Sequence, residues 1–392
     1  MLKNLYLASK ESNLFLIERF VKELLLTFGV VSTMAGYGAM ALPVADSVLV
    51  VQDSIILANL KLHTKKPKEI KYIKTIAERY TALLMADSAM VFWREATAID
   101  ANDDTVYYYQ AKLLQDQGHP NSATDAIQHA LAIQPLRVEY LSLYAHLCFE
   151  AKKDSQCLNA CEQMLGIDSM NGDALLLSGI VLSHAQRYDV ALERLNRCIQ
   201  LAPNTTDALV YRADILVIMG QYTTALTDYI MAHAETIANA DVLNNMGICY
   251  YQASDYRQAI ALFQRALVLN HLHPQSYFNK GLAYYQLQNF DTAQLAMKAA
   301  AGLWDSSGAA PKHERFLDAM YCLATCYKKT GNLEVAKKHF ELLQKEGYAK
   351  DLSQEIKNIE YAFFIAHNWY YFVLLFLLII GMIVAGLKMM RR

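Results

Sequence analysis

The feature that most constrains the fold of this 392-residue chain is a pattern that recurs at one fixed interval, about 34 residues long. One column of the pattern is always small: Ala77, Ala111, Ala145, Gly179, Ala213, Gly247 and Gly281. A second column is mostly large: Trp93, Ile127, Cys161, Leu195, Tyr229, Phe263 and Met297. Small residues let two helices approach closely, and a large residue from the facing helix fills the remaining space. The pattern therefore predicts a row of stacked helix pairs.

Turn residues divide each repeat into two antiparallel helices. Gly118, Gly220 and Gly331 fall at the turn within a repeat, and Pro135 and Pro203 fall at the junction between repeats. Glycine commonly ends a helix in the left-handed conformation, and proline commonly follows a helix end. These positions predict two helices in every repeat.

The repeats fill most of the chain. We expect seven contiguous repeats over residues 70–307, an insertion loop over 308–316 and an eighth repeat over 317–350. Only 16 Gly and 7 Pro occur in the whole sequence, and such a composition favours helix. The expected fold class is all-α.

The pattern resembles the tetratricopeptide repeat family, in which a large residue, Leu-Gly and Tyr are followed by Ala, Phe and Pro. The best-matching repeat carries Met246, Gly247, Tyr250, Ala259 and Phe263. The resemblance implies a right-handed superhelical solenoid of about eight helix pairs, with the first helices lining a concave groove. It also implies that the groove binds protein or peptide partners.

Two repeats depart from this pattern. The first has Leu84 and Ala86 where a turn is expected, which predicts longer helices or a displaced boundary. The third has Lys152, Cys157 and Cys161 where the family has Gly, Ala and Phe, so we expect a looser repeat there.

The resemblance also implies which residues face the groove. Asn245 and Asn279 occupy the same position in consecutive repeats, like the asparagines with which some family members hold a peptide backbone, and an amide both donates and accepts hydrogen bonds. The candidate groove residues are Tyr108, Tyr109, Lys112, Tyr211, Asp214, Asn244, Asn245, Asn279 and Gln286. The alternative is that these side chains are exposed to solvent or pack between repeats.

Acidic residues begin four consecutive first helices: Glu139, Asp173, Asp207 and Asp241. They could line one edge of the groove, but negative charge in the first turn is favoured by the helix dipole, and we prefer that interpretation. A groove for the acidic tail of a chaperone is not expected, because Glu78 and Leu143 interrupt the basic and amide positions that such a groove needs.

Little of the chain is left for chemistry. The segments outside the repeats are too short for a catalytic domain, and no phosphate-binding or dinucleotide-binding glycine motif occurs. His271 and His273 are the nearest histidine pair, and no cysteine or carboxylate cluster accompanies them. The net charge of −2 argues against nucleic acid as a partner. We therefore expect no enzyme activity, cofactor, metal or small-molecule substrate.

The seven cysteines are expected to be packing residues. Cys157 and Cys161 are four residues apart on one helix, as are Cys322 and Cys326, and this spacing rarely allows a disulfide. Small buried side chains explain most of them. Free thiols favour a reducing compartment, which conflicts with the export that the N-terminus suggests.

The C-terminal region is predicted to anchor the protein in a membrane. Residues 361–387 contain no Asp, Glu, Lys or Arg, and residues 369–387 form a helix of about 28 Å, close to the thickness of a hydrocarbon core. Residues 351–368 are expected to cap the repeats. Aromatic residues precede the span and basic residues follow it in a tail over 388–392: Trp369, Tyr370, Tyr371, Lys388, Arg391 and Arg392.

The N-terminal region is less specific. An amphipathic segment, 1–23, precedes an uncharged stretch, 24–45, and a connector, 46–69. The uncharged stretch is a signal peptide or a transmembrane helix, and the alternative is a helix buried against the repeats. With either of the first two, the basic tail places the repeats on the non-cytoplasmic, periplasmic side. A single tail anchor would place them on the cytosolic face.

Together these features predict a membrane-anchored scaffold or assembly factor that holds segments of partner proteins in a concave groove. One alternative is a cytosol-facing, tail-anchored receptor or adaptor. The other is a non-catalytic regulatory subunit of a membrane enzyme or secretion complex.

Overall fold

A computed structural model describes residues 54–305 and 314–390. The predicted segments 1–23 and 24–45, and the tail residues Arg391 and Arg392, lie outside the described residues. The chain divides into two compact parts, the N-terminal part up to Leu201 and the C-terminal part from Ala202. Each part is described by itself.

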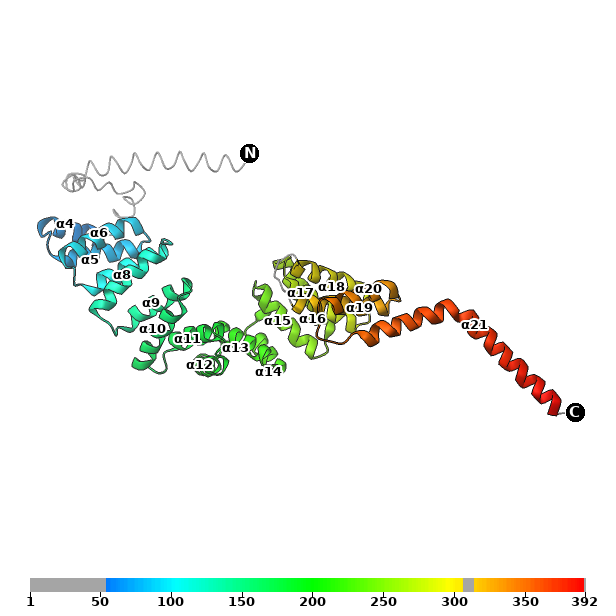
Figure 1. Cartoon of the computed structure of the whole chain (residues 1–392). Helices are drawn as coiled ribbons and strands as arrows, with labels where there is room; N and C mark the ends of the chain where they lie inside the picture. Colours follow the sequence, from blue (N-terminus) through cyan, green and yellow to red (C-terminus); the bar gives the residue numbers. More distant parts are fainter. Residues whose placement is uncertain (1–53, 306–313, 391–392) are drawn as a thin grey trace, which may run out of the picture. The chain divides into compact units, whose positions relative to one another are not determined.

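The described residues form 18 α-helices and no strand (Figure 1). The first helices of the repeats are α5 (Ile70–Ala82), α7 (Asp104–Asp116), α9 (Val138–Glu150), α11 (Gly172–His184), α13 (Thr206–Ile218), α15 (Ala240–Gln252), α17 (Pro274–Gln286) and α19 (Glu314–Lys329). The second helices are α6 (Ala86–Ile99), α8 (Pro120–Ile133), α10 (Asp154–Ile167), α12 (Tyr188–Leu201), α14 (Tyr222–Met231), α16 (Tyr256–Leu269), α18 (Phe290–Asp305) and α20 (Leu333–Lys345). From α5 to α18, each helix begins one repeat length after its counterpart in the preceding repeat.

The two columns of the repeat meet inside each helix pair. The glycines of the small column lie against the large residue of the second helix, as Gly247 does against Phe263 and Gly281 against Met297. Phe263 and Met297 are completely buried. The small column therefore sets how closely the two helices of a repeat approach.

Every described turn between a first and a second helix contains one residue with positive φ. These residues are Leu84, Gly118, Lys152, Gln186, Gly220, Ser254, Gln288 and Gly331, with φ between 58° and 81° except for Lys152 at 55°. A helix commonly ends in this left-handed conformation because it satisfies the last carbonyl groups. The expected boundary shift at Leu84 was wrong, because that repeat forms the same turn without glycine and its helices have the usual bounds. The third repeat forms this turn too, at Lys152.

These turns give a stability prediction. A non-glycine residue in the left-handed region costs roughly 1–2 kcal/mol, so we expect Lys152→Gly and Gln186→Gly each to raise the free energy of unfolding by about 1 kcal/mol. Gly118→Ala, at φ 75°, is expected to lower it by a similar amount. Urea unfolding followed by circular dichroism measures all three. Equal loss of stability in all three variants would contradict the prediction.

The repeat at α13 and α14 has a shorter second helix. After Met231, His233 adopts a left-handed φ of 49° and the chain continues as a 3-10 helix, η1 (Ala234–Thr236). Ala232 and Ala234 remain buried, so the chain still closes the core at this point.

Helices outside the predicted repeats cover both described ends. Within the predicted connector, α4 (Ser54–Lys65) packs on α5 and buries Ile56 and His63. The helix α4 ends one repeat length before α6 ends. It therefore ends where the second helix of a preceding repeat would end. At the other end, the predicted cap and span form one helix, α21 (Ser353–Met390). Its Ile359, and Leu352 just before the helix, pack in a core cluster with Phe340 and Leu343 of α20.

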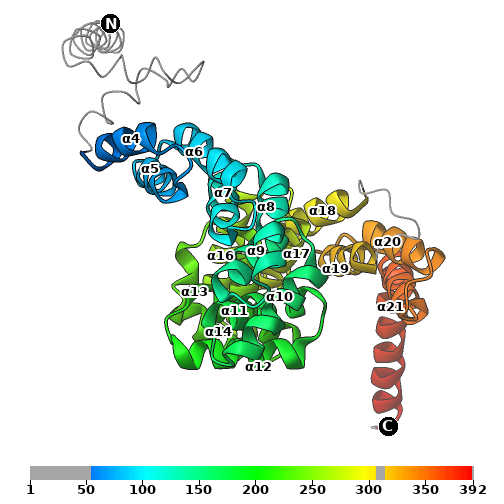
Figure 2. The same ribbon diagram turned by 90° about the vertical axis from the view of Figure 1, so that its left-hand side faces the viewer.

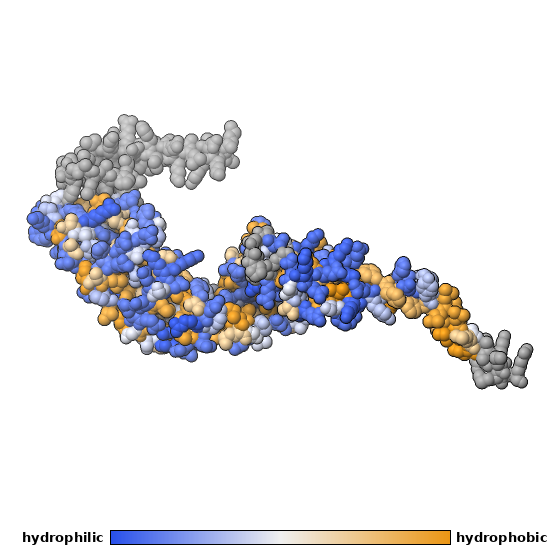
Figure 3. All heavy atoms as spheres, in the orientation of Figure 1, coloured by the Kyte–Doolittle hydropathy of each residue, from blue (hydrophilic) through white to orange (hydrophobic). Residues whose placement is uncertain are grey.

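The apolar part of α21 is exposed. The helix segment Ser353–Ile383 is long and apolar enough to cross a membrane. Its most apolar 18-residue window has a mean hydropathy of 2.0, and none of that window is buried. Figure 1 shows α21 continuing with a bend away from α19 and α20, and Figure 3 shows its outer part as hydrophobic. This helix is a candidate membrane span by length and composition.

The cysteines have the predicted structural role. All seven are free, and all except the half-buried Cys322 are buried. Burial raises the pKa of Cys322 and Cys249 to about 12, which disfavours reactive thiolates.

Candidate protein-binding face

The structure distributes the candidate groove residues over both parts of the chain. Tyr108, Tyr109 and Lys112 lie on α7 in the N-terminal part. The other six lie on the first helices α13, α15 and α17 of the C-terminal part: Tyr211, Asp214, Asn244, Asn245, Asn279 and Gln286. Five of these six side chains are buried or half-buried, and only Gln286 is exposed.

The polar side chains of the C-terminal part join neighbouring repeats. Asn245 of α15 donates a hydrogen bond to Asp214 of α13 (Nδ2···Oδ1 2.9 Å), and the Tyr229 hydroxyl donates to the same carboxylate oxygen. Asn279 of α17 donates to Asn244 of α15 (Nδ2···Oδ1 3.0 Å), and Asn244 donates to Asn245 (3.4 Å). The three amides therefore link three successive first helices.

The same set of bonds continues to the beginning of α17. Ser276 is completely buried and donates to the Asn244 side chain (Oγ···Oδ1 3.2 Å). His273 caps α17 by accepting from the Ser276 backbone N–H at Nδ1, and its Nε2 lies 2.9 Å from Asp241. We call this network the polar ladder; its members are Asp214, Tyr229, Asp241, Asn244, Asn245, His273, Ser276 and Asn279.

The polar ladder occupies the asparagines that were expected to line a groove. Asn244 is only 5% exposed. Asn245 and Asn279 are half-buried, and each amide nitrogen donates to a neighbouring repeat. Buried polar groups need such partners, since an unsatisfied one costs about 1–3 kcal/mol. The amides therefore pack between repeats, which was the alternative interpretation.

Burial controls the ionisation of the ladder carboxylate. Burial raises the pKa of Asp214, although the hydrogen bonds from Tyr229 and Asn245 oppose that increase. Burial also raises the pKa of Tyr211, and the nearby Asp207 and Asp214 carboxylates raise it further. This region therefore disfavours additional negative charge.

The candidate residues of the N-terminal part differ in their exposure. Tyr109 stacks on Trp93 at 4.8 Å between ring centroids, and Tyr108 stacks on Tyr140 at 5.0 Å. Both tyrosines are half-buried, whereas Lys112 is exposed. Lys112, together with Gln286 in the C-terminal part, is therefore the candidate side chain most accessible to a partner.

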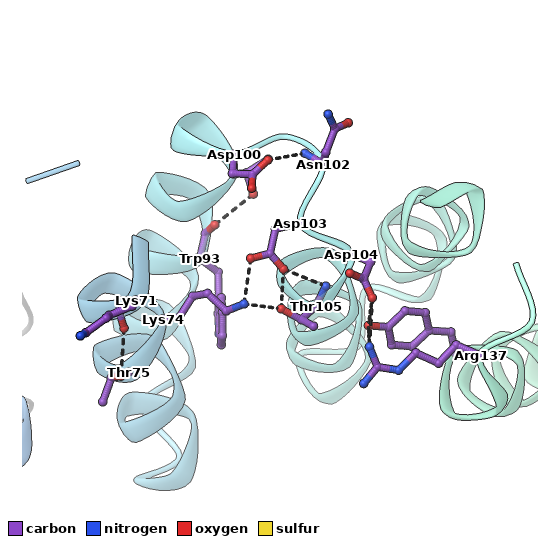
Figure 4. Close-up of polar contacts among 12 residues, drawn as sticks. Lys71, Lys74, Thr75, Trp93, Asp100, Asn102, Asp103, Asp104, Thr105 and Arg137 are labelled. Atoms are coloured by element: carbon purple, nitrogen blue, oxygen red, sulfur yellow. Dashed lines mark hydrogen bonds and ion pairs between the residues drawn. The ribbon is translucent and has the colours of Figure 1, made fainter. Parts of the chain in front are cut away.

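Ion pairs between repeats, which the sequence pattern did not reveal, hold α7 in place (Figure 4). Lys74 of α5 donates to Asp103 (Nζ···Oδ2 2.8 Å) and to Thr105 (2.6 Å), and Asp103 also caps α7. Arg137 and the Tyr140 hydroxyl, at the next repeat, both donate to Asp104 of α7. Acidic residues before a helix are a capping signal, but the sequence does not show which cation reaches them.

The acidic residues of the first turns take part in similar contacts. Asp173 of α11 accepts hydrogen bonds from Ser142 (Oγ···Oδ2 2.6 Å) and lies 2.9 Å from His146 Nε2, both on α9. Burial would raise the pKa of Asp173, but the bonds from His146 and Ser142 outweigh it and hold the pKa below its ordinary value. The bond to Asp173 raises the pKa of His146. The pair therefore favours a charged histidine.

This pair predicts a pH dependence of stability. In the folded protein the pKa of His146 is raised above its ordinary 6.5. The stabilisation of the fold by charged His146 is therefore fully present below about pH 6.5, and it is lost as the pH rises through the folded pKa. We expect wild type to lose this stabilisation between pH 5.5 and pH 8.5, and we expect His146→Gln to abolish that loss. Urea midpoints of the wild type and the variant at both pH values measure it. Parallel pH profiles would contradict the prediction.

The described residues offer no metal site. They contain no group of three or more His, Cys, Asp or Glu side chains arranged to hold a metal ion. His273 is used as a helix cap, and His271 is exposed at the same turn.

Family models of the tetratricopeptide repeat match residues 173–205, 240–271 and 274–303. These segments are tetratricopeptide repeats. They contain α11 and α12, α15 and α16, and α17 with most of α18. The polar ladder therefore spans two of the three matched tetratricopeptide repeats.

Curated relatives are distant and longer than the matched region. The BBSome complex member BBS4 of Bos taurus is 20% identical over 290 residues, which cover 74% of this chain and 53% of that protein. Tetratricopeptide repeat protein 13 of Homo sapiens is 26% identical over 176 residues, which cover 45% of this chain and 20% of that protein. The chain thus spans about half of the first relative and a fifth of the second.

Solved structures of tetratricopeptide proteins are also similar. YrrB, described as a TPR protein with an unusual peptide-binding site, is 20% identical, with a TM-score of 0.40, and the match covers 47% of this chain and 95% of that one. A tetratricopeptide repeat protein from Parabacteroides merdae ATCC 43184 is 15% identical, with a TM-score of 0.44, and the match covers 66% and 98%.

Proposed function

We propose that this tetratricopeptide protein is a membrane-anchored scaffold that binds segments of partner proteins along the face of its first helices. The observation that carries the proposal is α21, which packs on the last repeat through Ile359 and then continues as an exposed apolar helix. An exposed apolar surface of this size needs a lipid or protein environment. The name of the bovine relative, a complex member, supports a role in assembly.

The binding face is proposed to use side chains that the repeats themselves leave accessible. Lys112 and Gln286 are exposed on first helices, whereas the asparagines of the polar ladder already have partners. Gln286 donates to the Tyr251 hydroxyl (3.1 Å), so it also presents an aromatic neighbour to a bound segment.

The anchor is tested by fractionation. Truncation after Glu360 is expected to move the protein from the membrane pellet to the soluble fraction, whereas wild type resists alkaline carbonate extraction. The double variant Leu377→Arg with Leu378→Arg is expected to weaken insertion, since each charge at the centre of a span costs about 2.5–3.5 kcal/mol or more. Leu377→Ile with Leu378→Ile is the matched control. The truncation is made in a chain that also lacks residues 1–45, because the stretch 24–45 is itself a candidate span. Truncated protein of that chain that stays in the carbonate-resistant pellet would refute the anchor.

Partner binding is tested on the intact protein in its native membrane. Lys112→Ala with Gln286→Ala is expected to lower the recovery of crosslinked partners at least fivefold. Lys298→Ala, an exposed change on the second helix α18, is the matched control and is expected to have no effect. Unchanged recovery in the double variant would exclude Lys112 and Gln286 as partner-binding residues.

Two arrangements place the repeats on opposite sides of the membrane. We propose the non-cytoplasmic side, from the basic tail after the span. The seven free cysteines favour the second candidate, a cytosol-facing, tail-anchored adaptor, because exposure to an oxidising compartment selects for disulfides. Protection of the repeats from protease added to sealed vesicles of known orientation distinguishes the two.

A further inference from the structure

Hydrogen bonds fix which edge of the eighth repeat lies nearest to the apolar span. Gln344 of α20 donates to Ser353 of α21 (Nε2···Oγ 3.2 Å), and Lys337 of α20 donates to Glu360 of α21 (Nζ···Oε1 2.7 Å). As residue numbers fall along α20 they rise along α21, so the helices are antiparallel. The beginning of α20 is therefore the end nearer to the span, and Figure 2 shows α21 projecting away from α19 and α20.

The distance from this edge to the span is short. Glu360 makes the last ion pair with α20, and the exposed aromatic residues begin at once with Tyr361, which is 64% exposed. From Glu360 to Trp369 the helix rises about 14 Å. Leu333, where α20 begins, lies one helical turn beyond Lys337, so the turn between α19 and α20 is closer still to Trp369.

This turn is unusually basic. Residues 328–338, which we call the basic turn, contain four lysines and one glutamate: Lys328, Lys329, Lys337, Lys338 and Glu334. Its net charge is therefore +3. The corresponding segments of the three preceding repeats have net charges of 0, 0 and −1: 217–227, 251–261 and 285–295. Positive charge is thus concentrated in the repeat that carries the apolar helix.

Two of these lysines are available to an external anion. Lys329 is exposed and forms no ion pair with the described residues. Lys338 pairs with Glu334 (Nζ···Oε1 2.9 Å), but both side chains are about 70% exposed, and such pairs contribute little. Lys328 and Lys337 instead pair with Glu355 and Glu360 of α21, which brings the basic turn and α21 together.

We propose that the basic turn lies on the bilayer surface and binds anionic lipid headgroups, so that the eighth repeat is a second membrane contact beside the span. This inference rests on the proposed anchor. Lysines held near an anionic membrane surface each strengthen the contact about fivefold, and α21 holds Lys329 and Lys338 at that distance from the span.

The first experiment maps lipid contacts of the full chain in nanodiscs. A photo-crosslinking amino acid replaces Asn332 at the basic turn, Ala349 at the opposite end of α20, or Phe372 in the span; all three positions are exposed. The nanodiscs contain either zwitterionic phosphatidylcholine alone or the same lipid with 30% phosphatidylglycerol. We expect lipid adducts at positions 332 and 372 and none at position 349.

The second experiment tests the charge. Lys329→Gln with Lys338→Gln is expected to lower the adduct yield at position 332 at least fivefold in the anionic nanodiscs and to leave the yield in zwitterionic nanodiscs unchanged. Lys345→Gln with Lys350→Gln removes the same charge from the opposite end of α20 and is the matched control, with no change expected.

The outcomes separate this inference from the anchor. Adducts at position 372 without adducts at position 332 would overturn the lipid contact of the basic turn and leave the anchor standing. Adducts at neither position would overturn the anchor as well. Adducts at position 332 that are insensitive to the lysines, or equal in both lipids, would overturn recognition of anionic headgroups.

Discussion

Replacing Asp228 by Ala is expected to lower the free energy of unfolding by about 3–5 kcal/mol, because it removes the buried carboxylate that pairs with Arg212. Asp228 on α14 is 2% exposed and accepts two hydrogen bonds from Arg212 of α13, Nε···Oδ2 and Nη2···Oδ1, both 2.7 Å. Urea unfolding of wild type and variant, followed by circular dichroism, gives the difference.

A double variant separates the charge from the packing. Arg212→Met with Asp228→Leu fills the same space without charge and is expected to be far closer to wild type than Asp228→Ala, since buried ion pairs are often replaceable by apolar groups. A loss below about 1 kcal/mol for Asp228→Ala would show that the pair is not important for stability. A double variant as unstable as the single one would assign the loss to packing.

Gly247→Ala is expected to cost about 2–3 kcal/mol through overpacking. An added Cβ would lie 2.5 Å from Cε1 and 2.8 Å from Cδ1 of Phe263, a rigid ring that is completely buried. Either the ring or the helix must move, and either movement breaks contacts in the core of a matched repeat. The urea midpoint of Gly247→Ala against wild type measures the effect.

The next repeat supplies the matched control. In Gly281→Ala the added Cβ would meet the terminal methyl of Met297 at 2.9 Å, and that flexible side chain can turn aside. We expect a loss below about 1 kcal/mol there. Combining Gly247→Ala with Phe263→Leu should cost less than the sum of the two single changes. Equal losses at Gly247 and Gly281 would contradict the role of the ring.

The helix pairs were predictable from the sequence because their packing repeats. A column such as Ala77 to Gly281 fixes the phase of each first helix, and the turn glycines fix its end, so helix starts follow the same regular spacing. The departure at Leu84 misled the prediction for a physical reason. A residue other than glycine in the left-handed conformation costs only about 1–2 kcal/mol. The packing of the helices on either side of the turn offsets this cost.

The partners of the polar side chains were less predictable. The position of Asn245 suggests a groove in the same way as that of Asn279, because an amide facing a peptide and an amide facing the next helix leave the same sequence pattern. Only the stacking of α15 on α13 and α17 decides between them. The same is true of Lys74, whose link to Asp103 depends on how the first two repeats pack.

The attachment of α21 has a mechanical consequence. Tension applied at the bilayer would enter the array through Ile359 and the Lys337–Glu360 pair of the eighth repeat. The polar ladder ends at α17, so it does not reinforce this repeat. In arrays that contact only their neighbours, loss spreads from the loaded end. Under force the eighth repeat should unfold first, while the block from α13 to α17 stays folded.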